Sequence, residues 1–289
     1  MNKLERILVA NDDLRGLETA ISKAEVLEHF TGSSVEVAQV VWDPIEEEDE
    51  LVASERANLI SAYMAAERAS LHRLMAPHRQ KVAWSEERVL WNKRPYEAIC
   101  KEVDSRRIDL LIKPVSKRSM LDFVHTPLDW ALIRDIHCPV LISKSEAWQI
   151  GGSIVAAIDT QGQHSSVNNE IISIAVLLGE ILQADIHLVT VAPDPRHSIS
   201  PALVSEMIES RKEKLQAIAT SSKLHNIKVH VELGSPAKAI ASLSKKLNAT
   251  LAVLGTHSRT GAQKWVLGNT VEKALGLIEC DTLSIRVPR

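Results

Sequence analysis

The chain has 289 residues, of which 45% are hydrophobic and 25% are charged, and its formal net charge at pH 7 is -3. This length predicts about two domains, and no apolar run reaches the roughly 18 residues that a bilayer-spanning helix needs. The weak negative charge excludes binding that is driven by bulk attraction to nucleic acid or to an anionic membrane.

The chain begins with MNKLERILVANDD, which leads directly into a strand-like run. We therefore expect no signal peptide, no membrane insertion and a cytoplasmic location. The three cysteines, Cys100, Cys138 and Cys280, are widely spaced and lie beside apolar runs, which predicts buried reduced thiols.

An internal repeat organises the chain. RILVANDD (Arg6 to Asp13) parallels SIVAAIDT (Ser153 to Thr160), and the two aligned aspartates are Asp12 and Asp159, 147 positions apart. Further along, SSVEVAQVV parallels ADIHLVTVA, and CPVLISK parallels CDTLSIRV. The predicted domains are residues 1–146 and 152–289, joined by the Gly-containing connector SEAWQIGGS.

Each half reads as β-α-β-α-β-α-β-α-β. Continuous apolar runs such as IDLLIKPV and ATLAVLGT are typical of parallel strands covered on both faces. Apolar residues at helical spacing predict helices over 205–222 and 236–247, and the acid-led segment 46–75 predicts a long helix. The fold class is therefore α/β, with two doubly wound parallel-sheet domains in tandem.

The closing strands of the two halves, PVLISK and TLSIRV, are candidate edges for pairing with each other. An exposed strand edge invites a partner, so we expect the halves to form an internal pseudo-dimer. Symmetric association is common, and two chains can pair again as a homodimer. The protein partners cannot be read from the sequence.

Ligands of open parallel sheets bind beyond the carboxyl ends of the strands. In the second half this rule brings together Asp159, the segment after the second strand, and the loop from Gly255 to Thr270. Glycines let the backbone approach a ligand, and the N–H groups before the helix VEKALGLI can face phosphate oxygens. Asp12 is expected to cap its turn, whereas Asp159 fits either a cap or a ligand contact.

The loop resembles the glycine signature of the universal stress protein family, in which two residues and then nine residues separate three glycines, followed by Ser or Thr. Gly255 and Gly268 fit the first and third glycines, whereas Ser258 and Asn269 depart from the pattern. The resemblance covers nearly the whole chain, once in each half. In the first half Lys113 replaces the first glycine, and TPLDW is similar to the tandem, E-type branch.

The resemblance implies an adenine-nucleotide alpha hydrolase-like, Rossmann-like fold for each half, and a first half that has lost nucleotide binding. It implies that ATP, with Mg²⁺, or AMP binds in the second half. The adenine-binding roles fall on Asp159 and Val191. The ribose and phosphate roles fall on Gly255, Ser258, Gly268, Asn269 and Thr270.

No residues are predicted to be catalytic, and none to bind a metal directly, because no phosphate-loop, dinucleotide, nucleophile-elbow or HExxH motif is present. The resemblance implies a non-catalytic stress-response protein. Two alternatives stay open: a sensor or carrier of an apolar or amphipathic ligand, and a slow ATPase switch.

Overall fold

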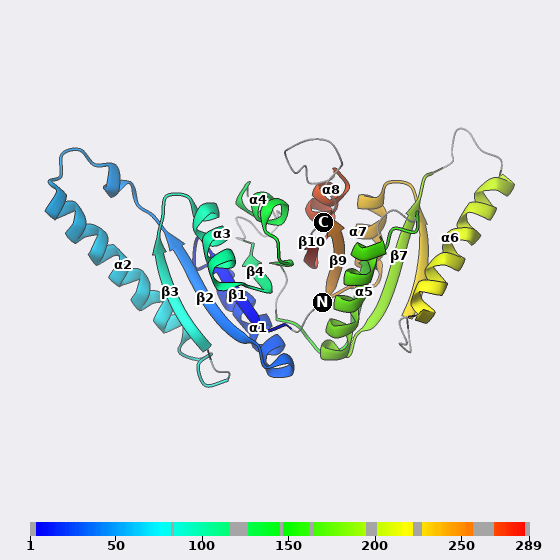
Figure 1. Cartoon of the computed structure of the whole chain (residues 1–289), viewed down its shortest axis with the longest axis horizontal. Coiled ribbons are helices and arrows are strands. Elements are labelled where there is room, and N and C mark those ends of the chain that lie inside the picture. Colours follow the sequence, from blue (N-terminus) through cyan, green and yellow to red (C-terminus); the bar gives the residue numbers. More distant parts are fainter. Residues whose placement is uncertain are drawn as a thin grey trace.

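The computed structural model describes residues 4–81, 84–115, 127–144, 147–161, 165–194, 201–221, 227–256 and 269–286. Within these ranges the strands form one ten-stranded sheet, in the order β3-β2-β1-β4-β5-β10-β9-β6-β7-β8. Figure 1 shows the two halves spread to either side of β10, with α2 and α6 at opposite far ends. The predicted α/β class and tandem doubly wound arrangement are confirmed.

The strands of the first half are β1 (Arg6–Asn11), β2 (Ser34–Val41), β3 (Trp84–Trp91), β4 (Leu110–Pro114) and β5 (Val140–Ser143). Those of the second half are β6 (Ser153–Ala157), β7 (Asp185–Ala192), β8 (Ile227–Leu233), β9 (Leu251–Thr256) and β10 (Asp281–Arg286). The strands near the middle of the sheet are almost wholly buried, whereas the outermost strands β3 and β8 are largely half-exposed. Continuous apolar sequence therefore marks the strands that helices cover on both faces.

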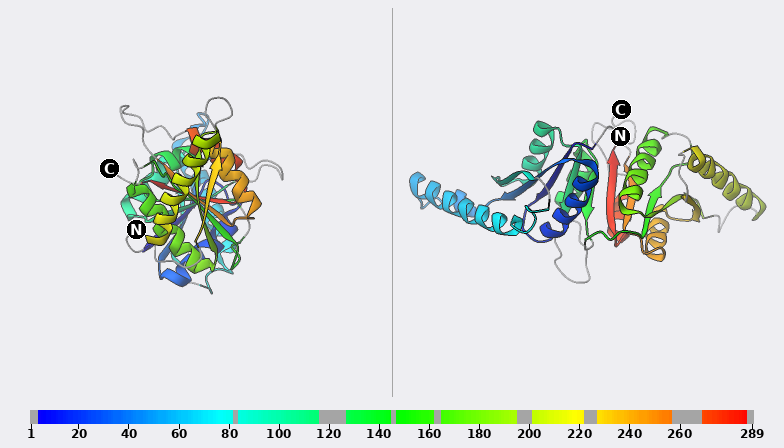
Figure 2. Two further views of the ribbon diagram at one scale, coloured as in Figure 1. Left: turned by 90° about the vertical axis from the view of Figure 1, so that its right-hand side faces the viewer. Right: turned by 90° about the horizontal axis from the view of Figure 1, so that it is seen from below.

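Helices cover both faces of the sheet. One apolar cluster lies under α1 (Leu17–Thr31), α2 (Ala53–Met75), α5 (Ser165–Leu182) and α6 (Pro201–Ser221). The other lies under α3 (Pro95–Arg106), α4 (Pro127–Asp135), α7 (Pro236–Lys246) and α8 (Asn269–Leu277). Each cluster runs through both halves, and Figure 2 shows the same layering from two further directions. None of these helices is long and apolar enough to cross a bilayer, as far as the described ranges go.

Local sequence sets the helix ends. Four helices, α3, α4, α6 and α7, begin at a proline, whose fixed φ suits the first turn and whose missing N–H costs nothing there. The α1 helix ends at Gly32, which adopts a left-handed φ of 67°. Arg107 and Asn248 take the same left-handed conformation directly after α3 and just after α7, with φ of 53° and 46°.

The predicted helix over 46–75 begins too early. A 3-10 turn, η1, occupies Pro44–Glu47, and α2 begins only at Ala53. The carboxylate of Glu46 accepts the indole N–H groups of Trp42 at 2.7 Å and of Trp91 at 3.0 Å. Tertiary contacts thus hold the acidic segment against the ends of β2 and β3 and outweigh its helical propensity.

The halves join through β5 and β10, which pair antiparallel with Leu141 opposite Leu283. The other strand pairs of the sheet in the described ranges are parallel. The pairing of the two closing strands is the pseudo-dimer contact expected from the sequence. It makes the strand order of the second half the mirror of the first.

Each half also caps the C-terminal end of a helix in the other half. The Lys144 ammonium, just after β5, donates to the carbonyls of Leu275 at 2.6 Å and Ile278 at 2.8 Å, at the end of α8. Arg286, which the strand register makes equivalent to Lys144, donates to the carbonyls of Asp135 at 2.7 Å and Ile136 at 3.4 Å, at the end of α4. A cation from each half thus satisfies the orphan carbonyls of a helix in the other.

We expect Lys144→Met to lower the free energy of unfolding by about 2 kcal/mol, because two buried charge-assisted hydrogen bonds are lost. Burial lowers the pKa of Lys144 to about 8, so the amine is mostly charged at pH 7. Arg286→Met is the matched control at the equivalent position and should cost less, because its side chain is more exposed. Urea unfolding followed by tryptophan fluorescence measures both, and equal losses would contradict this ranking.

A fully buried ion pair lies at the junction of the halves. Lys23 on α1 and Asp281 at the start of β10 are both inaccessible to solvent, and their Nζ and Oδ2 atoms are 2.6 Å apart. The indole N–H of Trp148, in the connector, donates to the same carboxylate at 2.7 Å. The Lys144 backbone N–H donates to its other oxygen at 2.7 Å. One carboxylate therefore ties together α1, β10, the end of β5 and the connector.

Candidate functional site

The carboxyl ends of β6, β7 and β9 meet at one edge of the second half. The β6 strand pairs in parallel with both β7 and β9, so the residues that follow these strands lie at the same edge. Asp159 follows β6, Val191 lies near the end of β7, and Gly255 lies near the end of β9. The structure therefore brings these three predicted residues to the edge where ligands of open α/β sheets bind.

Asp159 stabilises the turn that it enters. Its Oδ1 accepts the backbone N–H of Gln161 at 2.9 Å, which closes an Asx turn. The Asn168 side chain of α5 holds the main chain of Asp159 through two hydrogen bonds. Asn168 Nδ2 donates to the Asp159 carbonyl at 2.7 Å, and Asn168 Oδ1 accepts the Asp159 N–H at 3.1 Å. Asp159 is thus held rigidly at the edge while its side chain stays partly exposed. The turn role expected for it is observed, and its ligand role stays a prediction.

An arginine on α6 reaches the main chain of Val191. Arg211 Nη1 donates to the Val191 carbonyl at 3.3 Å. A carbonyl oxygen has two lone pairs, so this contact leaves room for a second donor. Nearby, the hydroxyls of Thr160, which follows β6, and Thr190, on β7, lie 3.1 Å apart, and both residues are buried. The sequence interpretation missed Arg211, since its only signal is one cation on an amphipathic helix.

Gly255 serves the packing of a helix. A Cβ atom at this position would lie 2.6 Å from Val167 Cγ1 and 3.0 Å from Ile171 Cδ1, both on α5. The backbone of β9 can therefore approach α5 closely only because residue 255 has no side chain. The close approach that the structure shows at this glycine is to α5, and the approach to a ligand expected from the sequence stays a prediction.

The remaining predicted contacts lie at or before α8. Ser258 and Gly268 fall outside the described residues. Asn269 and Thr270 form the first two positions of α8, whereas the sequence placed both before the helix. Such a shift at a helix boundary is common. The α8 helix contacts β9, and the phosphate role of its first residues stays a prediction.

The same edge of the first half holds a buried lysine. Lys113 Nζ donates to Asn11 Oδ1 at 2.7 Å and to the Pro114 carbonyl at 2.9 Å. It lies 3.3 Å from Asp12 Oδ1 and 3.4 Å from Asp129 Oδ1 on α4. We call Lys113, Asn11, Asp12 and Asp129 the lysine cluster. It joins β1, β4 and α4 where the second half has its predicted nucleotide edge.

The strand register corrects one assignment. Leu8 pairs with Leu111, and its repeat partner Val155 pairs with Ala252. Lys113 is therefore equivalent to Leu254, and Pro114 is the residue that replaces the first glycine. The prediction from sequence, which matched Lys113 with Gly255, was therefore wrong by one position. Backbone pairing between strands fixes the register.

Asp12 does not cap its turn as expected. The turn is closed by the neighbouring Asp13, whose Oδ1 accepts the backbone N–H of Arg15 at 2.6 Å. The Asp12 carboxylate instead faces Lys113. The signal that could have revealed the lysine cluster is a lysine inside the apolar strand IDLLIKPV, because a buried ammonium needs carboxylates or carbonyls around it.

Burial disfavours the ionised form of all three thiols, since it raises the pKa of each. Burial raises the pKa of Cys138 and of Cys280 to about 12. Cys138 is buried as predicted, whereas Cys100 and Cys280 are only half-buried by exposed area. No three His, Cys, Asp or Glu side chains gather into a possible metal site within the described ranges.

Known proteins resemble this chain over its whole length. The model of the universal stress protein family matches residues 3–144 and again residues 152–286. Two relatives named universal stress protein E, from Photorhabdus laumondii and Escherichia coli K12, are each 27% identical to this chain. Each alignment covers 99% of it and 96% or 95% of the relative.

Solved structures agree. A putative universal stress protein from Pseudomonas aeruginosa UCBPP-PA14 is 28% identical with a TM-score of 0.74, and the match covers 98% of this chain and 93% of that one. A universal stress protein from Archaeoglobus fulgidus shares the fold, with 16% identity and a TM-score of 0.68 over 97% and 98% of the chains. The chain belongs to the universal stress protein family and carries the family's domain twice.

Proposed function

We propose that this stress-response protein is non-catalytic and cytoplasmic, and that it binds one adenine nucleotide, ATP with Mg²⁺ or AMP, in its second half alone. The observation that carries the proposal is the contrast between two equivalent edges. The first half places the lysine cluster at its edge, whereas the second half has Leu254 at the position of Lys113.

The lysine cluster supports placing no phosphate in the first half. Its single ammonium faces the carboxylates of Asp12 and Asp129, so this cation is already engaged within the protein. In the second half Leu254 stands at this position, and the family resemblance assigns adenine to Asp159 and Val191 and phosphate to the start of α8.

The site residues keep the roles implied by the resemblance. Asp159 and the Val191 main chain would hold adenine, with Arg211 beside the base. Gly255, Ser258, Gly268, Asn269 and Thr270 would hold ribose and phosphates. The bound nucleotide would act as a sensed ligand, since none of the described side chains at this edge forms a nucleophile–base pair.

The test is calorimetric titration of ATP with Mg²⁺ and of AMP into nucleotide-free protein, after mass spectrometry of the purified protein under native and then denaturing conditions. We expect one nucleotide per chain, with binding lost in Asp159→Ala. The matched control is Asp12→Ala at the equivalent position of the first half, which should bind normally. Absence of a carried nucleotide, of binding heat and of a thermal shift with ATP and Mg²⁺ would overturn the proposal.

The carrier of an apolar ligand is the second candidate. A crevice between α1 and α5, at the junction of the halves, has an almost wholly apolar lining: Leu4, Leu27, Asp109, Leu110, Pro139, Ile174, Leu177, Leu178 and Leu283. Its cavity volume of about 20 Å³ is room for roughly one water molecule, so a lipid-like ligand would require α1 and α5 to move apart. A lipid-like mass released on denaturation would support the carrier, and turnover of ATP abolished by Asp159→Ala would support the ATPase switch.

Association of two chains into a homodimer is a separate part of the proposal. Light scattering coupled to size-exclusion chromatography tests it, and a mass of one chain at micromolar concentration would contradict it.

A further inference from the structure

Two histidines form a hydrogen-bonded pair in the second half. His187 Nδ1 on β7 lies 2.9 Å from His230 Nε2 on β8, and the rings are stacked with centroids 5.1 Å apart. His187 is 3% exposed, and His230 is half-buried. Val189, which is paired with His230, belongs to the apolar cluster under α7 and α8. Because side chains alternate along a strand, both imidazoles lie on the α7 face.

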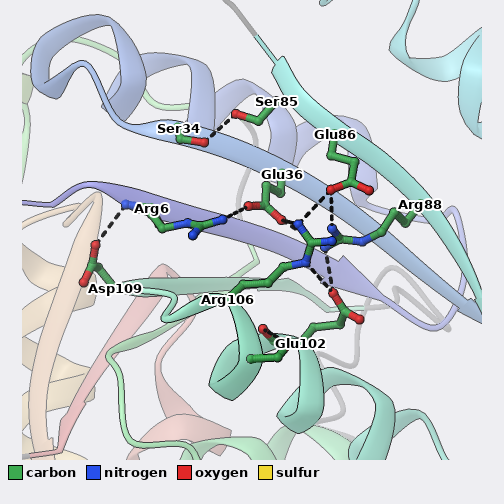
Figure 3. Close-up of polar contacts among 10 residues, drawn as sticks. Arg6, Ser34, Glu36, Ser85, Glu86, Arg88, Glu102, Arg106 and Asp109 are labelled. Carbon is green, nitrogen blue, oxygen red and sulfur yellow. Dashed lines mark hydrogen bonds and ion pairs between the residues drawn. The ribbon is translucent and has the colours of Figure 1, made fainter.

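An ion pair occupies the equivalent positions of the first half. Val9 pairs with Val37, and its repeat partner Ala156 pairs with Leu188, so Glu36 is equivalent to His187. The β2–β3 and β7–β8 registers then make Arg88 equivalent to His230. Figure 3 shows Glu36 and Arg88 in contact, with a shortest distance of 3.0 Å.

The helix above the ion pair also contributes charges. Arg106 on α3 lies 3.0 Å from Glu36, and Glu102 lies 2.8 Å from Arg88 (Figure 3). Arg6 approaches Glu36 from β1 at 2.6 Å. Burial opposes the charge of Glu36, yet these arginines hold its pKa below the ordinary value. Glu36 therefore keeps its charge in mild acid.

The second half has no counterpart of these helix charges. The backbone bonds that follow the helices, Ile108 N–H to the Val103 carbonyl and Ala249 N–H to the Ser244 carbonyl, align α3 with α7. In that alignment Leu243 stands at the position equivalent to Glu102, and Leu247 at the position equivalent to Arg106. A permanent ion network has thus been replaced by two imidazoles and two leucines.

An imidazole pair cannot hold two added protons. The hydrogen bond needs a lone pair on one ring and an N–H on the other, whereas two imidazolium rings offer only donors and repel each other. Burial lowers the pKa of His187, helped by His230 and Lys228 and opposed by Asp185. Burial also lowers the pKa of His230, helped by Lys246 of α7 and Lys228 and opposed by Glu232.

The direction of the pH effect follows from these shifts. A histidine with a lowered pKa in the closed state binds more protons once the structure opens. The closed state is therefore fully stable above the ordinary histidine pKa of about 6.5, and it loses stability as the pH falls below that value. At the equivalent position of the first half, the lowered pKa of Glu36 lies below this range, so Glu36 keeps its charge there.

We propose that the His187–His230 pair is an acid-sensitive latch, which in mild acid releases β8 and α7 of the second half while β3 and α3 of the first half stay closed. The β8 strand ends the strand order of the sheet, so it can separate without disturbing more central strands. The latch is independent of nucleotide binding.

Hydrogen–deuterium exchange of the full chain at pH 7.5 and pH 5.5 tests the latch, with rates corrected for intrinsic exchange. Protection of residues 227–233 and 236–246 should fall about 100-fold, because two histidines each take up a proton on opening and each proton changes the equilibrium about tenfold per pH unit below the free pKa of about 6.5. The internal reference is residues 84–91 and 95–106, whose protection should change little.

The variant His187→Gln/His230→Gln separates the latch from general acid sensitivity. Glutamine retains hydrogen-bonding groups and does not titrate, so the pH dependence of protection should disappear even if the absolute protection is lower. A second variant, His230→Gln, should remove about half of the pH dependence on a logarithmic scale. Equal losses of protection in both halves, or an unchanged pH response in the double variant, would overturn the proposal.

Discussion

Replacing Asp281 with Asn is expected to lower the free energy of unfolding by about 3–5 kcal/mol, because it removes the charge of a carboxylate that is ion-paired with the fully buried Lys23 ammonium. Lys23 and Asp281 are both fully buried, and the carboxylate also holds the connector through Trp148. Chemical unfolding followed by tryptophan fluorescence gives the loss directly, with Trp148 itself as one of the reporters.

The double variant Lys23→Met/Asp281→Asn is the informative control. Replacing a whole buried ion pair often costs little, since the desolvation of both charges is avoided. We expect it to recover most of the stability that Asp281→Asn loses. If the double variant is less stable than the single one by the full cost of Lys23→Met alone, the two side chains act independently and the buried pair is not the source of the effect.

Introducing valine at Gly255 is expected to cost about 3 kcal/mol, since even the Cβ atom would lie 2.6 Å from Val167 Cγ1 in a packed interior. The larger side chain must push α5 away from β9. The same unfolding measurement detects this loss, and calorimetry with ATP and Mg²⁺ on the folded fraction separates it from any loss of ligand affinity.

A second substitution distinguishes packing from ligand contact. In a Val167→Ala background the closest atom is removed, so Gly255→Val should cost at least 1 kcal/mol less than in the parent. A ligand role alone predicts the opposite pattern, with unchanged stability and lost nucleotide binding in both backgrounds. Such a pattern would contradict the packing role that the geometry assigns to this glycine.

The architecture follows from periodicity in the sequence. Apolar strands alternating with amphipathic helices predicted the doubly wound halves, and the repeat predicted that the closing strands would pair. Residue-level pairing was harder to predict. The acidic segment before α2 looked helical because nothing local reveals that Trp42 and Trp91 share the Glu46 carboxylate.

The candidate site was predicted as a location more than as a set of contacts. The carboxyl-end rule brought Asp159, Val191 and Gly255 to one edge, as the structure has them. Their contacts depend on residues far away in the sequence: Asn168 and Val167 on α5, and Arg211 on α6. The sequence matched Lys113 with Gly255, one position away from its true equivalent. Strand pairing, which the sequence does not reveal, shows that Lys113 is equivalent to Leu254.

The buried pair of Lys23 and Asp281 bears on how two like domains came to differ. In a dimer of identical subunits every contact across the twofold axis occurs twice, whereas this ion pair occurs once, because the strand register places Pro139 where the other half has Asp281. Proline offers no side-chain acceptor. A lysine can be neutralised in this one-sided way only if the axis relates two unlike sequences. Joining the halves in one chain therefore removes the constraint of symmetry, and each half is free to lose a site or gain a latch that the other does not share.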